Sequence, residues 1–190
     1  QTGYQETVYN DFYIGEDCDV TIVAGCGIHN CGVDTSKHVG IHTFYVKKNA
    51  KVKYIEKHYG EGDGNGENVM DPTTVVYLDE NAHLEMDTVQ IKGIDSTNRV
   101  TKAYLKDNAS IEISEKIMTH GKQVAKTDFY VDLDGKDSSA NVVSRSVARG
   151  DSHQIFSSKI NGNNACAGHS ECDAIIMDNA HVSAIPESLS

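Results

Sequence analysis

Asn49-Ala50-Lys51-Val52 is the stretch that decides the fold, because similar tetrapeptides recur along the chain. The recurrences are Asn81-Ala82-His83-Leu84, Asn108-Ala109-Ser110-Ile111 and Asn179-Ala180-His181-Val182, with weaker echoes at Asp17-Cys18-Asp19-Val20 and Ser139-Ala140-Asn141-Val142. Asn and Asp tolerate the left-handed conformation of a tight corner, alanine fits its inside, and the aliphatic residue that follows starts an inward-facing strand. The pattern therefore predicts a series of similar corners, each followed by a strand.

Short runs rich in β-branched and aromatic residues occur between turn-forming Gly, Asn or Asp residues, as is typical of strands. The clearest runs are 52–55, 74–78, 129–133, 141–143 and 174–177. Within one of them, Phe129, Val131 and Leu133 alternate with more polar neighbours, which predicts a strand with one buried face.

The tetrapeptides begin at positions 17, 49, 81, 108, 139 and 179, so that their spacing varies between 27 and 40 residues. Hairpin turns of the Asn-Gly or Asp-Gly type are scarce, and the signatures of propeller blades are missing. A solenoid whose coils each add about 4.8 Å, and whose corners absorb loops of unequal length, explains this spacing best. We therefore predict an all-β parallel β-helix, with an antiparallel sandwich as the rival.

Composition narrows the function classes. The 190 residues suit one domain, and the net charge of −11 without a basic cluster argues against a nucleic-acid partner. No apolar run approaches the roughly 20 residues of a transmembrane helix, and no secretory leader is recognisable, so we expect no membrane partner. Five cysteines, an odd number, fit a cytoplasmic chain with reduced thiols better than a secreted disulfide framework.

A first group of candidate ligands consists of Cys26 and Cys31, followed by His38 and His42. These are zinc-binding residue types, and the His pair has the three-residue gap of a zinc-finger pair. The residues between the two histidines read as strand, however, and a strand would hold the imidazoles apart. A zinc-stapled structural module and a set of ordinary buried or surface residues both stay open. Single histidines such as His58, His83, His120 and His181 are expected at the surface or in loops.

A second group, between Cys166 and Asp173, gathers two thiols, an imidazole and two acids within eight residues. Thiolates ligate iron–sulfur clusters and carry sulfane sulfur as persulfides. In a strand, Cys172 would share one face with Ala174 and Ile176, while Glu171 and Asp173 would point the other way. A functional thiol and a buried core thiol are equally compatible with these residues.

Three stretches resemble the core domain of the SufB/SufD family of iron–sulfur cluster assembly proteins, particularly its short SufB-like members. They are Gly25–Gly32 with Gly40–Phe44 and Tyr54–Gly62, then Ser144–Gly150, and finally Gly168–Ile176 continuing to Ala184–Glu187. The resemblance implies a single right-handed parallel β-helix core domain over residues 1–190, without the helical parts that flank it in the family. It also implies an assembly scaffold, not an enzyme by itself, on which a transient iron–sulfur cluster forms.

The resemblance further implies partners and a site. The partners would be a SufC-like ABC-type ATPase and a second SufB- or SufD-like subunit, or a second copy of this chain. Cys172 matches the position of a functional cysteine in SufB-type members and becomes the candidate sulfur acceptor or cluster ligand, with His169, Glu171 and Cys166 as accessory candidates.

Two departures from the family pattern limit these expectations. A His/Glu-containing strand that follows the Pro-Glu in the family would come after Glu187, and the terminal helices that dock onto SufC in the family are not in this sequence. In addition, no cysteine lies in 100–105, where some SufB proteins have a sulfur-entry cysteine. We therefore expect this core alone neither to bind SufC nor to hold a cluster. A polysaccharide-active β-helix enzyme is the remaining alternative, disfavoured by the absence of tryptophan and the odd number of thiols.

Overall fold

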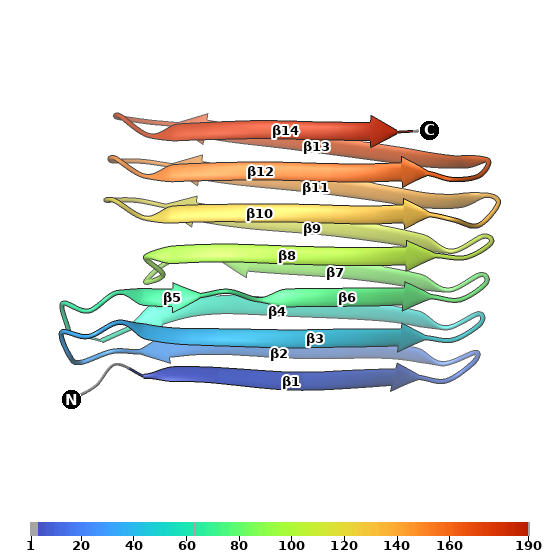
Figure 1. Cartoon of the computed structure of the whole chain (residues 1–190), viewed down its shortest axis with the longest axis horizontal. Coiled ribbons are helices and arrows are strands. Elements are labelled where there is room, and N and C mark those ends of the chain that lie inside the picture. Colours follow the sequence, from blue (N-terminus) through green and yellow to red (C-terminus); the bar gives the residue numbers. More distant parts are fainter. Residues whose placement is uncertain (1–3, 63, 190) are drawn as a thin grey trace.

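The computed structural model describes residues 4–62 and 64–189. All helix or strand elements in these residues are β-strands, and none is a helix. The strands form two sheets that lie face to face, and the chain passes from one sheet to the other and back as it climbs the stack (Figure 1). Neither described segment contains a helix that is long and apolar enough to cross a membrane.

The two sheets contain eight and six strands. The larger sheet consists of β1 (Gln5–Ile14), β3 (Ser36–Val46), β5 (Asn68–Met70), β6 (Thr73–Leu78), β8 (Ser96–Leu105), β10 (Val124–Leu133), β12 (His153–Gly162) and β14 (His181–Leu189). The smaller sheet consists of β2 (Asp19–His29), β4 (Lys51–Glu61), β7 (His83–Gln90), β9 (Ser110–Thr119), β11 (Ser138–Ala148) and β13 (Cys166–Ile176).

The pairing confirms the predicted parallel β-helix. Each strand pairs in parallel with the strand one turn earlier, for example β1 with β3, from Gln5 opposite Lys37 to Ile14 opposite Val46. The result is a solenoid of about six turns. Since all the strand pairs in the described residues are parallel, the rival antiparallel sandwich is wrong.

Three of the predicted corners lie where expected, between a strand of the larger sheet and the next strand of the smaller one. Asn49, Asn81 and Asn108 have φ angles of 62°, 59° and 56°, and the alanine after each is fully buried. The Asn81 amide donates a hydrogen bond to Asn49 Oδ1 (2.8 Å), and the Asn49 amide donates one to Asp17 Oδ1 (2.9 Å). Each corner therefore has its own left-handed residue, and hydrogen bonds link successive corners along the stack.

The other Asn-Ala copy belongs to the opposite corner, which is a correction. Asp178, not Asn179, has the left-handed conformation (φ 59°), and this turn leads from β13 into β14, back to the larger sheet. Glycines Gly121 and Gly150 have left-handed φ angles at the equivalent turns below it. The weak echo at 139 is also displaced, because Asp137 is the left-handed residue there (φ 60°). A tetrapeptide alone does not show at which of the two edges of the solenoid its turn lies.

The interior is divided into an apolar and a polar half. The predicted buried face of β10 is confirmed, since Phe129, Val131 and Leu133 are at most 1% exposed. These aliphatic and aromatic side chains lie toward the Asn corners, where each strand of the larger sheet ends. Toward the opposite corner many of the buried side chains are polar or charged, among them Glu56, His58, Thr88, Gln90, Thr97, Arg99, Glu115, Thr119, Thr127, Ser144, Ser146 and Gln154.

Parallel pairing sets part of this polar half in a column. Glu56 of β4 is opposite Thr88 of β7, Thr88 is opposite Glu115 of β9, Glu115 is opposite Ser144 of β11, and Ser144 is opposite Cys172 of β13. We call these five residues the interior ladder. It places the candidate thiol in the same column as two buried carboxyl groups.

Candidate functional site

Cys172 lies on the inner face of β13. The residue is half-buried and packs against the main hydrophobic core, directly beside Ser144 of the interior ladder. The strand alternation inferred from sequence is thus observed in β13. Burial, together with the nearby Glu115 carboxyl, raises the pKa of the Cys172 thiol, so the group is less readily ionised than an exposed cysteine.

A small cavity lies beside Cys172 inside the solenoid. Its volume is about 10 Å³, and its lining includes Cys172 together with the polar residues Glu115, Thr127, Ser144, Ser146 and Gln154. A volume of this order admits about one atom or group the size of a water molecule. The thiol therefore faces a polar interior space that is large enough for one small ligand atom.

Glu115 is the acidic residue of this cavity, and one of its oxygens has an unfilled hydrogen-bonding position. The hydroxyls of Ser144 (2.8 Å) and Thr127 (3.3 Å) both donate to Glu115 Oε2. The other oxygen, Oε1, is buried and has no hydrogen-bond partner among the residues described. Burial raises the pKa of Glu115, and Arg99 and the two hydroxyls offset that shift only in part. Burial and the unfilled oxygen therefore favour the neutral acid over the carboxylate.

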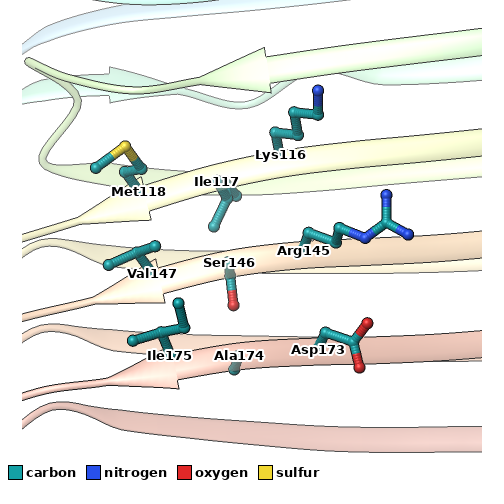
Figure 2. A pocket seen from close by; sticks show the side chains of 9 residues that line it. All are labelled: Lys116, Ile117, Met118, Arg145, Ser146, Val147, Asp173, Ala174 and Ile175. Carbon is teal, nitrogen blue, oxygen red and sulfur yellow. The ribbon is translucent and has the colours of Figure 1, made fainter.

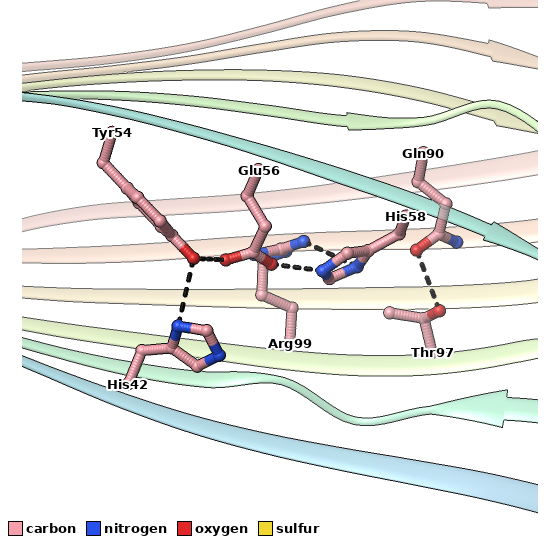
Figure 3. Close-up of polar contacts among 7 residues, drawn as sticks. All are labelled: His42, Tyr54, Glu56, His58, Gln90, Thr97 and Arg99. Carbon is pink, nitrogen blue, oxygen red and sulfur yellow. Dashed lines mark hydrogen bonds and ion pairs between the residues drawn. The ribbon is translucent and has the colours of Figure 1, made fainter. Parts of the chain in front are cut away.

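A second buried cluster surrounds Glu56, two rungs along the interior ladder (Figure 3). Arg99 Nη1 lies 3.1 Å from Glu56 Oε1, and Arg99 Nη2 donates to His58 Nδ1 at 3.1 Å. His58 Nε2 also contacts Glu56 Oε1, and the Tyr54 hydroxyl donates to Glu56 Oε2. His42 Nδ1 lies 3.2 Å from the Tyr54 oxygen. Both oxygens of Glu56 therefore have partners.

The cluster consists of an ion pair between Glu56 and Arg99, surrounded by neutral side chains. Burial alone would raise the pKa of Glu56, but Arg99, His58 and Tyr54 hold it below the ordinary value, so Glu56 is ionised. Burial and the Arg99 charge lower the pKa of His58, and burial lowers that of His42. Both imidazoles are therefore neutral at pH 7. Because Arg99 donates to His58 Nδ1, the His58 proton is on Nε2 and faces Glu56.

The structure separates Cys172 from its accessory candidates. His169 and Glu171 contact each other (3.4 Å) on the outer face of β13, opposite to the thiol. Cys166 has the same inward parity as Cys172, but it begins the strand six residues earlier and is exposed. Cys172 thus has no second soft ligand beside it, and a complete cluster-binding ligand set does not fit the described part of this chain.

The four residues of the predicted zinc staple do not come together as one metal site. Cys26 lies on β2 and packs against the small core cluster of Ile28, Met70 and Ile94, and burial raises its pKa to about 11. Cys31 is exposed and its sulfur lies 2.9 Å from His29 Nε2. His38 and His42 both lean over Gly40 of β3, with Nε2 atoms 3.6 and 3.2 Å from the point that a Cβ would occupy. Across residues 4–62 and 64–189, no three His, Cys, Asp or Glu side chains form a metal-binding group.

Another cavity lies outside the solenoid, on the outer face of β9, β11 and β13 (Figure 2). It is a shallow groove of about 370 Å³ between a charged row, Lys116, Arg145 and Asp173, and an apolar row, Met118, Val147 and Ile175. Asp173 follows Cys172 in sequence but points to this outer side (Figure 2). The groove and the thiol are therefore on opposite faces of the same sheet.

Sequence reasoning missed the buried charges. His58 was expected at the surface or in a loop, and this is wrong, because its residue is 3% exposed and it joins Glu56 and Arg99 in the interior. The available signal was strand parity: Tyr54, Glu56 and His58 alternate with outward-facing residues in one strand. Arg99 and Glu115 lie at buried positions of β8 and β9 in the same way.

A strand-only solenoid with a half-buried thiol facing a polar interior places this chain among the parallel β-helix proteins. Residues 9–189 match the family model described as SUF system FeS cluster assembly, SufBD core domain, and the chain belongs to the SufBD family. The predicted family is thereby confirmed.

Curated archaeal relatives agree. An iron–sulfur cluster assembly SufBD family protein of Methanocaldococcus jannaschii is 28% identical over 179 residues, which cover 93% of this chain and 55% of the relative. Relatives described in the same words from Archaeoglobus fulgidus and Methanothermobacter thermautotrophicus are 25% identical (96% of this chain, 48% of the relative) and 27% identical (96% and 44%). The chain spans about half the length of these curated relatives.

Proposed function

We propose that this chain is the β-helix core of an iron–sulfur cluster assembly scaffold, with Cys172 as the residue that accepts sulfur. The observation that carries the proposal is the position of Cys172 in a chain of the SufBD family: a half-buried thiol on the inner face of β13, beside a polar cavity. Partial burial shields a bound sulfur atom from solvent thiols, and the polar lining supplies hydrogen-bonding groups.

The scaffold works with partners and acts in the cytoplasm. All five cysteines are free in the described structure, which supports a reducing compartment. Iron and the nascent cluster are cargo, and Cys172 supplies one thiolate toward them. Because no second soft ligand lies beside Cys172, the other ligands come from a second SufB- or SufD-like subunit or a second copy of this chain. A SufC-like ABC-type ATPase supplies the energy, so the chain is not an enzyme by itself.

Anaerobic reconstitution of the full-length protein with iron and sulfide, together with its partner subunits, tests the assignment. We expect thiolate-to-iron charge-transfer absorption that is lost in Cys172→Ser and kept in Cys166→Ser, because Cys166 is an exposed thiol at the start of the same strand. Unchanged absorption in the Cys172→Ser protein would remove this thiol from the mechanism.

Co-purification tests the partners independently of the thiol. The full-length protein is expressed with the SufC-like ATPase of its own organism, and the complex is isolated by a tag on the ATPase. We expect a stable complex in both the wild-type and the Cys172→Ser proteins, since the thiol lies inside the solenoid. Failure of the wild-type protein to bind the ATPase would contradict the proposed partner.

A further inference from the structure

We propose that Glu115 is a positioning residue for sulfur carried on Cys172: its neutral carboxyl group donates a hydrogen bond from Oε1 to the terminal sulfur of a Cys172 persulfide, which occupies the small interior cavity. The inference rests on the proposed function of Cys172 as a sulfur acceptor. It adds a binding subsite for a single sulfur atom, and it gives a role to a buried acid that has no structural partner for one of its oxygens.

The protonation state of Glu115 follows from its hydrogen bonds and burial. An ionised carboxylate in this position would be 2% exposed, with two hydroxyl donors on Oε2 and nothing on Oε1. Burying a charge with one side unsatisfied is much more costly than burying the neutral acid. The neutral acid keeps both hydroxyl bonds on Oε2 and places its own O–H on the free oxygen, where it is available as a donor.

The cavity connects this donor to the thiol. Glu115 and Cys172 both line it, and Ser144 stands between them in the interior ladder. Ser146, another lining residue, has a buried hydroxyl that also has no partner among the described residues. Two residues with an unpaired polar atom therefore line a space of about 10 Å³ that Cys172 lines as well. The space matches the single additional atom that distinguishes a persulfide from a thiol.

The chemistry requires only a donor persulfide as co-reactant. The Cys172 thiolate attacks the terminal sulfur of a donor R–S–SH; a new S–S bond forms on Cys172 while the donor S–S bond breaks. The thiolate R–S⁻ leaves with the electron pair and takes up the proton that Cys172 released, so that no net oxidation occurs. The resulting persulfide is more acidic than a thiol, and its terminal sulfur is largely anionic at neutral pH. A neutral O–H donor stabilises that anion, whereas a carboxylate would repel it.

The test measures the lifetime of the persulfide in the full-length protein. Wild-type protein and variants are loaded with inorganic polysulfide and desalted, and the Cys172 persulfide is then followed by alkylation and mass spectrometry. We expect Glu115→Leu to lose the terminal sulfur about tenfold faster than wild type, the scale of one lost charge-assisted hydrogen bond. Glu115→Gln keeps an N–H donor in place and should stay within about threefold of wild type.

Matched variants separate positioning from folding. Glu112→Gln changes a carboxyl on the exposed face of the same strand, and should leave the lifetime unchanged. Glu115→Asp keeps the acid but withdraws it by one methylene, so it should shorten the lifetime even if the leucine variant does not fold. Thermal unfolding of each variant shows whether the fold is intact.

The outcomes are distinguishable. A wild-type protein that forms no persulfide on Cys172 refutes the sulfur-acceptor role itself, and with it the inference. A wild-type persulfide whose lifetime is unchanged in the folded variants among Glu115→Leu and Glu115→Asp leaves that role standing and overturns the positioning role of Glu115. Rapid loss in those variants with rescue in Glu115→Gln supports it, because a merely structural role would not restore the lifetime without restoring stability.

Discussion

Glu56 and Glu115 occupy the same column of the solenoid, and their surroundings shift their pKa values in opposite directions. Both belong to the interior ladder, two rungs apart, and their residues are 1% and 2% exposed. Glu56 is ionised because Arg99, His58 and Tyr54 satisfy both of its oxygens. The neutral form of Glu115 is favoured because, among the described residues, only two hydroxyl groups donate to it, and both reach the same oxygen.

The two carboxyl groups differ because the opposite sheet supplies different partners to each of them. These partners make one a structural site and leave the other available for a reaction. Around Glu56 both carboxylate oxygens have partners, which come from an ion pair and neutral side chains. Around Glu115 the hydrogen bonding is left incomplete, next to a small cavity and the thiol of Cys172. Natural interiors satisfy most buried polar groups, so an unfilled position beside a nucleophile is a reason to infer function.

Removing the cation should give the largest effect. Arg99→Met leaves Glu56 buried without its counter-ion, and we expect the free energy of unfolding to fall by about 3–5 kcal/mol, measured by urea denaturation at pH 7. Lys102→Met, on the exposed face of the same strand, is the matched control and should change it by less than about 0.5 kcal/mol. Adding Glu56→Gln to Arg99→Met should recover part of the loss; a double variant less stable than Arg99→Met would contradict the ion pair.

The pH dependence of Glu56 gives the next effect. Since its pKa is lowered in the folded protein, its ionisation stabilises the fold above the unfolded value of about 4.3 and this contribution is lost as the pH falls below it. Glu56→Gln should be about 2 kcal/mol less stable than wild type at pH 7, with a difference that narrows in acid. Urea denaturation between pH 3 and pH 7 measures this, and a constant difference would show that Glu56 is not ionised in the fold.

Glu115 should respond with the opposite sign. Its pKa is raised, so the contribution to stability is complete below about pH 4.3 and is lost as the pH rises toward the folded pKa. Arg99 and the Cys172 thiol are its charged and titratable neighbours. We expect Glu115→Gln to match wild type near pH 4 and to be about 1 kcal/mol more stable at pH 7, measured by the same denaturation series. A variant that is less stable at pH 7 would mean that the native carboxyl is ionised.

The solenoid and its interior ladder could be predicted from the sequence only in part. The Asn-Ala tetrapeptides showed the corners because a left-handed residue followed by a buried alanine leaves a local signature, as at Asn49 and Asn81. Strand alternation gave the inward face of Cys172 in the same way. Local patterns also misassigned Asn179, because the two edges of a solenoid use similar turns and the spacing does not label them.

The site around the Cys172 thiol could not be predicted from the sequence, for a different reason. Arg99 and Glu56 are 43 residues apart, and only the register of the rungs brings their side chains within 3.1 Å. Similarly, Glu115 and Cys172 come from turns separated by β11, so their shared cavity is a product of stacking. A carboxyl group read singly from sequence is expected at the surface, since most are. In this protein the strand register places these carboxyl groups in the interior, and that register depends on the loop length at every corner.

The smallest effect should come from Thr88, the rung between the two carboxyl groups. Its hydroxyl is buried and has no partner in the part of the chain that the structure describes, so it contributes nothing to either site. Thr88→Val removes the hydroxyl with little change of shape, and we expect an unchanged or slightly raised free energy of unfolding, by up to about 1 kcal/mol. Glu115 should keep its pH response in this variant, as measured by comparing Thr88→Val with Thr88→Val/Glu115→Gln at pH 4 and pH 7. A loss of that response would show that the ion pair and the cavity acid form one coupled network, because the two carboxyl groups would then depend on the residue that separates them.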